Sequence, residues 1–534
     1  MVKRYLDIFF KYIDPIPGFG FIHRPKLLQL WLDGRHDPRL LRVICGVASR
    51  FISVRERRTL PDGQVWINEA EKQIMQNTDS LEETDIESLI LIAFDHGSSG
   101  RFGRLRHLLN YATKQAYLKL MNYEDVNEGH LEPERRRRLM WALWMLGTVY
   151  SSDDANLCFC STDTIHISLP CDEISFDRDT LATTSTLQDA RTTSDTQNQG
   201  LYAHLVRILD IRRRIRGSND SAKQKQLSET AGMSSMVISS SFVAPFEQEL
   251  STFVDSLPPH YSLGPRNFCR YISSPELTTF LMLHVWLLHT RGELYKAAAA
   301  SVENRFRIQS LVGEVQPTQE LNHWRRQAFR NAVSMSSLFA TALHIDPDIC
   351  VSDPRLAKSA QDAVSTILKQ RMYDMPAAND LQLWKSYLRP CAEILRRPSS
   401  FYPAVNLIYD AILEAIGSES VSHEEFKKVV RWTAEGALTD EHPEKKSIRG
   451  ELANRLVFQD PWAYDPLLDE DGQDAYLSST VASSSICTDA SPASDVVALT
   501  CLSAIKESAD DMFWDAGSDN IDFSTIDFGT FLLG

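Results

Sequence analysis

One short stretch of the chain carries residue types that bind zinc. Thiolate and imidazole groups suit this ion, and the stretch contains Cys158, Cys160, His166 and Cys171. Their spacing fits no structural zinc site, in which ligands come at regular, closely spaced intervals. Free cysteine often behaves as a small apolar side chain, so ordinary buried or loop cysteines are the favoured interpretation. We expect no metal site and no bound cofactor in this chain.

A second group of residues superficially suggests a hydrolytic trio. Asp95, His96 and Ser98 are near neighbours in sequence, whereas the members of a catalytic triad come from separate elements that meet in space. We therefore interpret them as a helix end. Zinc-protease, Walker-type and nucleophile-elbow motifs do not occur, and Asp153-Asp154 is too slight for the aspartate-rich metal motifs of an all-α terpene cyclase. We expect no catalytic residues and no enzymatic activity.

Two arginine clusters have the composition of nuclear import signals or nucleic-acid patches. The first runs from Arg135 to Arg138, and the second comprises Arg212, Arg213, Arg214 and Arg216. For the first cluster we favour a solvated or ion-paired helix face. The second cluster borders a weakly patterned stretch where an import receptor would have access, so both interpretations stay open there.

The net charge of the chain bears on DNA binding. The sequence has 56 Lys and Arg against 71 Asp and Glu, a formal net charge of −15. A field of this sign repels the phosphate backbone. We expect this chain alone to bind DNA poorly.

The segment after Lys506 has no basic residue and alternates aspartates with large apolar side chains. Such alternation is typical of disordered activation segments, because the aspartates keep the aromatic rings solvated and able to dock into shallow grooves of a coactivator. We predict an activation segment over residues 507–534, with a plain disordered tail as the alternative. The candidate docking residues are Phe513, Trp514, Phe523, Phe528 and Phe531.

Helices must position these residues, because apolar side chains recur at three- and four-residue steps through most of the chain. One helix is expected to end near Gly97, a second to cover 105–120 and a third to begin near Pro133. We predict an all-α fold with disordered loops and a disordered acidic C-terminal tail. The predicted parts are a helical part at 1–177, a linker or disordered segment with the second basic cluster at 178–241, a helical part at 242–465 and a disordered tail at 466–534.

Cysteine usage and hydropathy indicate the compartment. Nine scattered cysteines without paired spacing indicate a reducing, intracellular environment. The longest apolar run, from Phe280 to Leu288, is far shorter than the roughly 20 residues that a membrane-spanning helix needs. We expect no membrane segment.

The segment 134–170, ERRRRLMWALWMLGTVYSSDDANLCFCSTDTIHISLP, resembles the signature of a known family, the regulatory (middle homology) domain of fungal zinc binuclear cluster transcription factors. That signature consists of arginines, an aromatic pair, a helix and then Leu-Pro. Residues 9–25, 257–259 and 281–295 resemble other parts of the domain in the same order, so the resemblance covers roughly 1–420. One departure is that Leu-Cys-Phe-Cys at 157–160 replaces the usual Gly-Arg-Pro.

The resemblance implies a multi-helix regulatory domain in a nuclear protein that regulates transcription by RNA polymerase II, as an activator through its acidic segment. Such factors normally carry six upstream cysteines that hold two zinc ions and place a helix in the major groove, and this sequence has no such array. Zinc and DNA contacts would thus belong to an absent module or a partner. Expected partners are coactivators or the transcription machinery, and itself or a related regulator as a dimer. The alternative is a DNA-binding-deficient interaction or inhibitory partner of a full-length zinc-cluster regulator.

Overall fold

The computed structural model describes residues 2–52, 63–76, 82–124, 131–150, 160–180, 182–192, 199–229, 242–310, 319–374 and 381–417. All of them belong to one compact unit, Met1–Gly472. Their regular structure is helical, and the bridges between extended residues that occur in these ranges are isolated ones. The predicted all-α class is confirmed. The predicted tail at 466–534, with its aromatic docking residues, lies outside the described residues.

The first group of helices packs around α3 and α6. Helix α3 contacts α1, α5 and α6, while α6 contacts α7 and α7 contacts α8. A capping box begins α6, in which the Glu82 backbone N–H donates to Asp85 Oδ2 at 3.0 Å. The helices are α1 (Val2–Tyr12), α2 (Arg24–Leu32), α3 (Pro38–Ser49), α5 (Gly63–Gln76), α6 (Glu83–Ser98), α7 (Phe102–Leu118) and α8 (Leu131–Tyr150).

The two helices that the sequence predicts on either side of Gly97 are present as α6 and α7, which pack against each other. Helix α6 ends at Ser98, and Gly100 makes the turn with a φ of 82°, a backbone conformation that glycine adopts without strain. Gly97 lets the two helices approach closely, because a Cβ at this position would overlap the Leu105 side chain. The sequence pattern therefore located this joint correctly.

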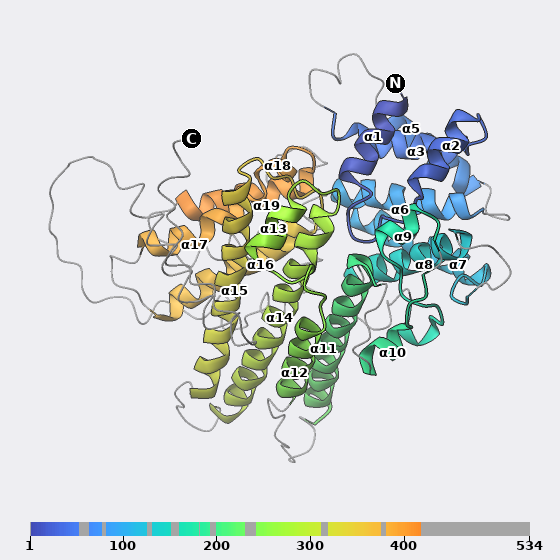
Figure 1. Cartoon of the computed structure of the whole chain (residues 1–534). Helices are drawn as coiled ribbons and strands as arrows, with labels where there is room; N and C mark the ends of the chain where they lie inside the picture. The colour runs from blue at the N-terminus through green and yellow to red at the C-terminus, as the bar shows by residue number, and fades with distance from the viewer. Residues whose placement is uncertain are drawn as a thin grey trace, which may run out of the picture. The chain divides into compact units, whose positions relative to one another are not determined.

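The second group contains three long helices that lie alongside one another. Helix α14 contacts both α11 and α15, and α16 packs against α15 and α17 (Figure 1). The elements after α8 are η2 (Thr162–Thr164), α9 (Glu173–Asp177), α10 (Leu187–Thr192), α11 (Leu201–Glu229), α12 (Val243–Asp255), α13 (Pro265–Tyr271), α14 (Leu277–Ser310), α15 (Gln319–Ile345), α16 (Leu356–Asp374), α17 (Leu381–Glu393), α18 (Arg396–Ser399) and α19 (Pro403–Gly417).

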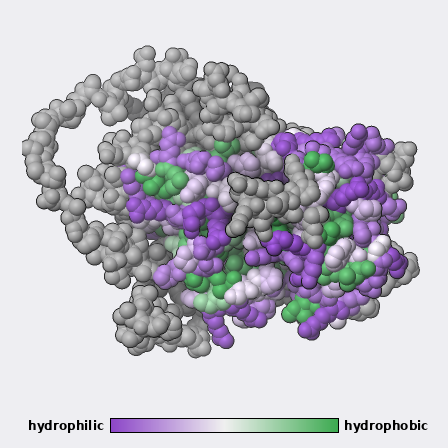
Figure 2. Space-filling view, turned by 90° about the horizontal axis from the view of Figure 1, so that it is seen from above, coloured by the Kyte–Doolittle hydropathy of each residue, from purple (hydrophilic) through white to green (hydrophobic). Residues whose placement is uncertain are grey.

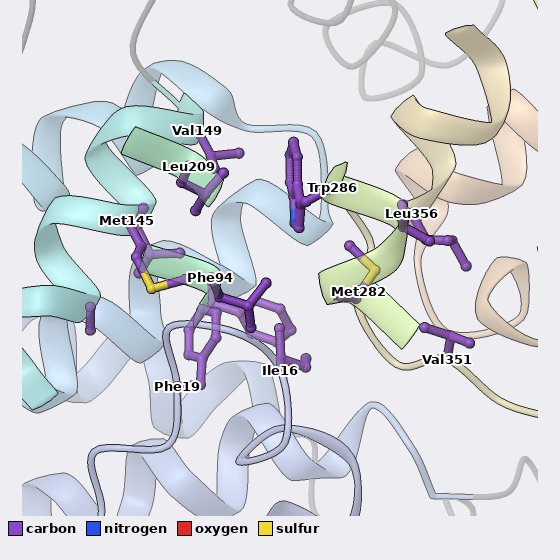
Figure 3. Packing of buried hydrophobic residues seen from close by; sticks show 14 of the residues in the cluster. Ile16, Phe19, Phe94, Met145, Val149, Leu209, Met282, Trp286, Val351 and Leu356 are labelled. Carbon is purple, nitrogen blue, oxygen red and sulfur yellow. The ribbon is translucent and has the colours of Figure 1, made fainter. Parts of the chain in front are cut away.

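Both groups contribute to one hydrophobic cluster. Figure 3 shows part of it, where Phe94 of α6, Met145 of α8, Leu209 of α11 and Met282 of α14 are among the side chains that converge. The apolar run from Phe280 to Leu288 is buried in this cluster. The helices before residue 178 and those after residue 242 therefore share a core.

The structure differs from the sequence prediction at the linker. Residues 178–241 were expected to lack a fold, yet 201–229 form α11, whose first half is buried up to Ile215. Neighbouring elements cover this half on several sides, so apolar residues occur all round it and no single stripe marks it as a helix. The linker prediction is wrong for this part of the chain.

The surface of the described part is mainly polar. On the face shown in Figure 2, hydrophilic residues predominate and hydrophobic ones form small, separate patches. Among the described residues, no helix combines the length and the hydropathy that crossing a bilayer would require. The exposed large apolar side chains are Leu32, Val65, Leu118, Leu120, Tyr123, Ile174 and Leu413.

Candidate functional site

The first arginine cluster is an ion-paired helix face, as the sequence favoured. Each of its four residues on α8 contacts a carboxylate of α6, of α8 itself or of the segment after α7. This confirms the structural interpretation of the cluster. The pairs, with their N···O distances, are Arg135–Glu87 at 2.6 Å, Arg136–Glu83 at 3.0 Å, Arg137–Glu124 at 3.0 Å and Arg138–Glu134 at 3.0 Å.

Arg138 is the most enclosed of the four, with a fully buried side chain. Its Nη1 donates to the Gly20 carbonyl at 3.0 Å and to Glu173, and its Nη2 donates to the Cys171 carbonyl at 2.9 Å. The guanidinium also lies over the Phe176 ring, 3.9 Å from its centroid. One side chain thus joins α8 to the segment after α1 and to the segment around the Leu-Pro.

The aromatic pair of the signature packs at the same junction. Trp141 and Trp144 are buried edge to face, with ring centroids 5.6 Å apart. The Trp141 indole N–H donates to the Ser168 carbonyl at 2.7 Å, directly before Leu169-Pro170. The arginines, the tryptophans and the Leu-Pro, which the sequence presents in order, therefore contact one another in the fold.

The residues considered for zinc binding have other neighbours. The Cys160 thiol lies 3.0 Å from the Tyr117 hydroxyl, and the His166 ring stacks on Tyr123. Burial, with a contribution from the charge of Glu134, raises the pKa of the Cys171 thiol to about 12. Cys158 lies outside the described residues. In the described part of the chain, no three His, Cys, Asp or Glu side chains form a group that could hold a metal ion.

The second arginine cluster lies on α11 and is also ion-paired. Arg212 Nη2 donates to Glu293 of α14 at 2.6 Å, while Arg213 and Arg214 both contact Asp210. Arg214 Nη1 also donates to Glu249 at 2.8 Å. Arg216 is half-buried. Of the two interpretations that the sequence left open, the ion-paired helix face is present here, and the import role stays a prediction.

Asp95, His96 and Ser98 lie at the end of α6, as predicted. Asp95 pairs with Arg50 and with Arg101, and His96 Nε2 lies 2.9 Å from Glu71 Oε2. The Ser98 hydroxyl has no hydrogen-bond partner among the described residues. The three side chains do not form a relay, so the interpretation as a helix end is confirmed.

A cleft of about 60 Å³ lies where the two groups of helices meet, and the sequence analysis missed it. Its walls come from α6, α7, α8, α11, α14, α16 and α19, which are far apart in sequence. In Figure 3, Trp286 stands between Val149 of α8 and Leu356 of α16. The lining residues are Gly97, Phe102, Val149, Tyr150, Arg212, Trp286, His289, Pro354, Arg355, Ala357, Lys358, Ala404, Val405 and Ile408.

The polar wall of this cleft carries cations whose carboxylate partners lie outside the lining. Lys358 Nζ is 2.6 Å from Asp362, and Arg355 Nε donates to Asp353 at 2.8 Å. Arg212 pairs with Glu293, as described above. The lining therefore contains basic groups and no carboxylate, because the acid that pairs with each cation is not one of the lining residues.

Burial and charge determine the protonation of this wall. Burial lowers the pKa of His289 by more than neighbouring Glu293 and Asp362 raise it, so the imidazole is neutral at pH 7. Burial also opposes the charge of Arg355, yet the charge and hydrogen bonds of Asp353 leave the pKa of Arg355 above its usual value. Arg355 is thus a permanent cation beside a neutral histidine.

Two buried donors at the cleft have no hydrogen-bond partner among the described residues. They are Arg355 Nη1 and Trp286 Nε1. The other donors of Arg355 are used, since Nη2 donates to the Pro17 carbonyl at 2.6 Å. Buried donors without acceptors are costly, so these two groups require an explanation. A sequence signal did exist, because His289 and Glu293 interrupt the apolar face of α14 at a helical spacing of four.

Comparisons with known proteins find similarity to transcription factors. The Zn(2)-C6 fungal-type transcription factor FTF1c of Fusarium oxysporum f. sp. lycopersici is 24% identical over 231 residues, which cover 38% of this chain and 25% of that protein. An uncharacterized transcriptional regulatory protein of Schizosaccharomyces pombe is 21% identical over 315 residues, or 54% of this chain and 31% of that protein. The chain is similar to fungal transcription factors.

The matches cover part of each relative. The Fusarium factor FTF1a is 25% identical over 181 residues, which are 31% of this chain and 17% of that protein. The chain thus spans about a quarter to a third of the length of the two relatives named first. No family model matches the sequence, and no solved structure matches it.

Proposed function

We propose that this chain regulates transcription by RNA polymerase II in a fungal nucleus, as the helical regulatory part of a Zn(2)-C6 type factor. The observation that carries the proposal is the similarity to relatives described as Zn(2)-C6 transcription factors and as a transcriptional regulatory protein. The junction at Arg138 supports the finer assignment to the middle homology domain, because the parts of the resembling signature contact one another there. The proposal assigns no catalytic residue to the chain.

In this proposal the helical body senses a signal or restrains the activity of the protein, and residues 507–534 recruit a coactivator. The test fuses residues 500–534 to an unrelated DNA-binding domain and measures reporter transcription. We expect output above background, and substitution of Trp514 and Phe523 by alanine should remove it because the docking rings are lost. A matched variant with two aspartates changed to glutamate keeps the charge and should retain output. Background output from the unsubstituted fusion would refute the activation segment.

The second candidate function is a DNA-binding-deficient partner that dimerises with a full-length zinc-cluster regulator. It is favoured by the net charge of −15, because an acidic chain repels the phosphate backbone and would rely on a partner for DNA contacts. Chromatin occupancy of the tagged chain separates the two functions when it is measured in cells with and without its Zn(2)-C6 relatives. Occupancy that persists at specific sites without the relatives would exclude the partner function. Occupancy that depends on them supports it.

Nuclear import through the second arginine cluster, Arg212, Arg213, Arg214 and Arg216, is part of the proposal and has its own test. A fluorescent fusion of the full chain with Arg213 and Arg216 changed to glutamine is compared with one in which the exposed Arg35 and Arg42 are changed. Loss of nuclear accumulation in the first fusion alone, at unchanged thermal stability, supports an import signal. Equal accumulation in both would show that the cluster acts only in folding.

A further inference from the structure

The cleft between the two groups of helices differs from the surrounding core in what it offers a ligand. Its lining contains Arg212, Arg355 and Lys358 and no carboxylate. Two fully buried donors, Arg355 Nη1 and Trp286 Nε1, have no acceptor among the described residues. One N–H of a guanidinium and one indole N–H, both buried without acceptors in residues that line the same cleft, can together hold an anionic oxygen group.

The charges of the wall limit the charge of that anion. Each lining cation is already paired with an acid of the protein, through Glu293, Asp353 and Asp362. His289 adds no positive charge at neutral pH, because burial keeps it unprotonated. The residual positive potential is therefore modest. It suits one negative charge better than the two of a phosphate dianion, whose desolvation would cost more.

The remaining wall is apolar and the space is small. Val149, Val405 and Ile408 face the cleft together with Ala404. A buried water needs roughly 10–15 Å³ of such space, so about 60 Å³ holds a ligand of only a few non-hydrogen atoms. An apolar wall opposite hydrogen-bond donors is typical of sites for small amphipathic ligands.

We propose that this cleft binds a short-chain monocarboxylate. The carboxylate accepts hydrogen bonds from Arg355 and Trp286, and the alkyl part contacts Val405 and Ile408. Bound in this way, the ligand connects α14, α16 and α19 with the end of α8. The site goes beyond the proposed regulatory function and does not depend on it, since binding is measured on the purified chain.

The experiment measures the melting temperature and the binding heat of the purified full chain with acetate, butyrate and hexanoate. Sodium chloride keeps the ionic strength constant, and 1-butanol and inorganic phosphate serve as the comparison ligands. We expect butyrate to raise the melting temperature saturably, because a ligand that binds only the folded state stabilises it. The alcohol lacks the charge and phosphate lacks the apolar group, so neither should do so.

Two variants test the position of the site. Trp286→Phe removes the N–H donor and keeps an aromatic ring, and Ala404→Leu fills the cleft without changing its charge. Both should weaken butyrate binding at least about tenfold, Trp286→Phe because one hydrogen bond to a charged group is lost and Ala404→Leu because the larger side chain occupies the space of the ligand. Ala411→Leu is the matched control, since Ala411 lies on the same helix α19, is 7% exposed like Ala404 and does not line the cleft.

Several results would overturn the proposal. A stabilisation by butyrate that survives in Ala404→Leu would place binding elsewhere. A saturable response to phosphate alone would assign the site to an inorganic anion. No saturable response to any of the carboxylates, with all variants folded, would mean that water satisfies the two donors.

Discussion

Arg138 shows at the scale of one residue why the arginine run is there. Its guanidinium lies between Glu134 and Glu173, with two main-chain carbonyls accepting its remaining donors. Removing one partner of a buried ion pair leaves a buried charge without compensation. The free energy lost in this way is larger than the free energy that the intact pair contributes to stability. Arg138 therefore connects segments of the fold, and its substitution should lower the free energy of unfolding.

Arg138→Met should lower the free energy of unfolding by about 3–5 kcal/mol, the range for breaking a buried ion pair. Urea unfolding followed by circular dichroism measures this. The control is Arg35→Met at an exposed position, which should change stability by less than about 0.5 kcal/mol. Equal effects of the two substitutions would contradict the role of Arg138.

Glu276 makes stability depend on pH. Burial, followed by the charges of Glu173 and Asp172, raises its pKa from 4.5 to about 7, although Arg138 and Arg270 act in the opposite direction. Between about pH 4.5 and pH 7, the Glu276 carboxyl therefore keeps its proton in the folded state and has released it in the unfolded state. The stabilising contribution is fully present below about pH 4.5 and is lost as pH rises through about 7.

Glu276→Gln, which stays neutral, should therefore become more stable than the natural chain as pH rises from 5 to 8. We expect a difference of about 1–3 kcal/mol at pH 8, measured as the change in melting temperature across that range. Glu414→Gln changes an exposed glutamate in the same way and is the control. A difference between Glu276→Gln and the natural chain that is independent of pH would show that Glu276 is ionised in the folded protein.

Sequence reasoning at the residue scale predicted the kind of contact better than the partners. The run from Arg135 to Arg138 lies at a helix start beside Glu132 and Glu134, so ion pairing was predictable, whereas the pairs with Glu83 and Glu87 of α6 were not. The cleft was not predictable, because its lining runs from Gly97 to Ile408 and only the packed fold brings these positions together. The one local signal was the pair His289 and Glu293 on an apolar helix.

At the scale of helices, apolar residues at three- and four-residue steps predicted α6, α7 and α8, although α6 after Asp85 and the second half of α8 are buried on every side. Helix α11, whose first half is also buried, was missed because the polar residues around 178–200 dominated the composition of the region. Composition therefore misled the prediction for a helix that lies directly beside a polar segment. This helix carries Arg212 to the cleft.

Two glycines in helices should respond to the same substitution with opposite signs. Gly97→Ala should lower the free energy of unfolding by about 1–3 kcal/mol, because the new methyl group overlaps Leu105 in the adjacent helix. Gly217 of α11 has open space around it, so Gly217→Ala should raise it by about 0.5–1 kcal/mol. Chemical denaturation measures both.

The double variant with Leu105→Ala tests the cause of the loss at Gly97. The smaller side chain leaves room for the methyl group, so adding Gly97→Ala to Leu105→Ala should cost less than adding it to the natural chain. An unchanged cost would place the effect of Gly97 in the backbone and would contradict the close approach of α6 and α7.

At the scale of the described unit, the segment at 401–402 completes the core of the first helices. Phe401 packs on Phe51 with ring centroids 5.0 Å apart, and the rings of Tyr402 and Phe94 lie edge to face with centroids 6.1 Å apart. A fragment of residues 1–192 should therefore show weak tertiary structure alone and recover it when mixed with residues 199–417. Near-ultraviolet circular dichroism measures this. A fragment 1–192 that melts alone as cooperatively as the mixture would show that the first helices form a separate domain.

The contact between Arg355 and the Pro17 carbonyl has a consequence for biosynthesis. The two residues are separated by 338 positions, and ribosomes add about 5–20 residues per second. The segment after α1 must therefore wait roughly 20 to 70 seconds for its partner to be translated. During that interval Ile16 and Phe19, which are buried in the finished protein, are present on a nascent chain. This chain should therefore depend on ribosome-associated chaperones more than a protein of equal length whose contacts are local.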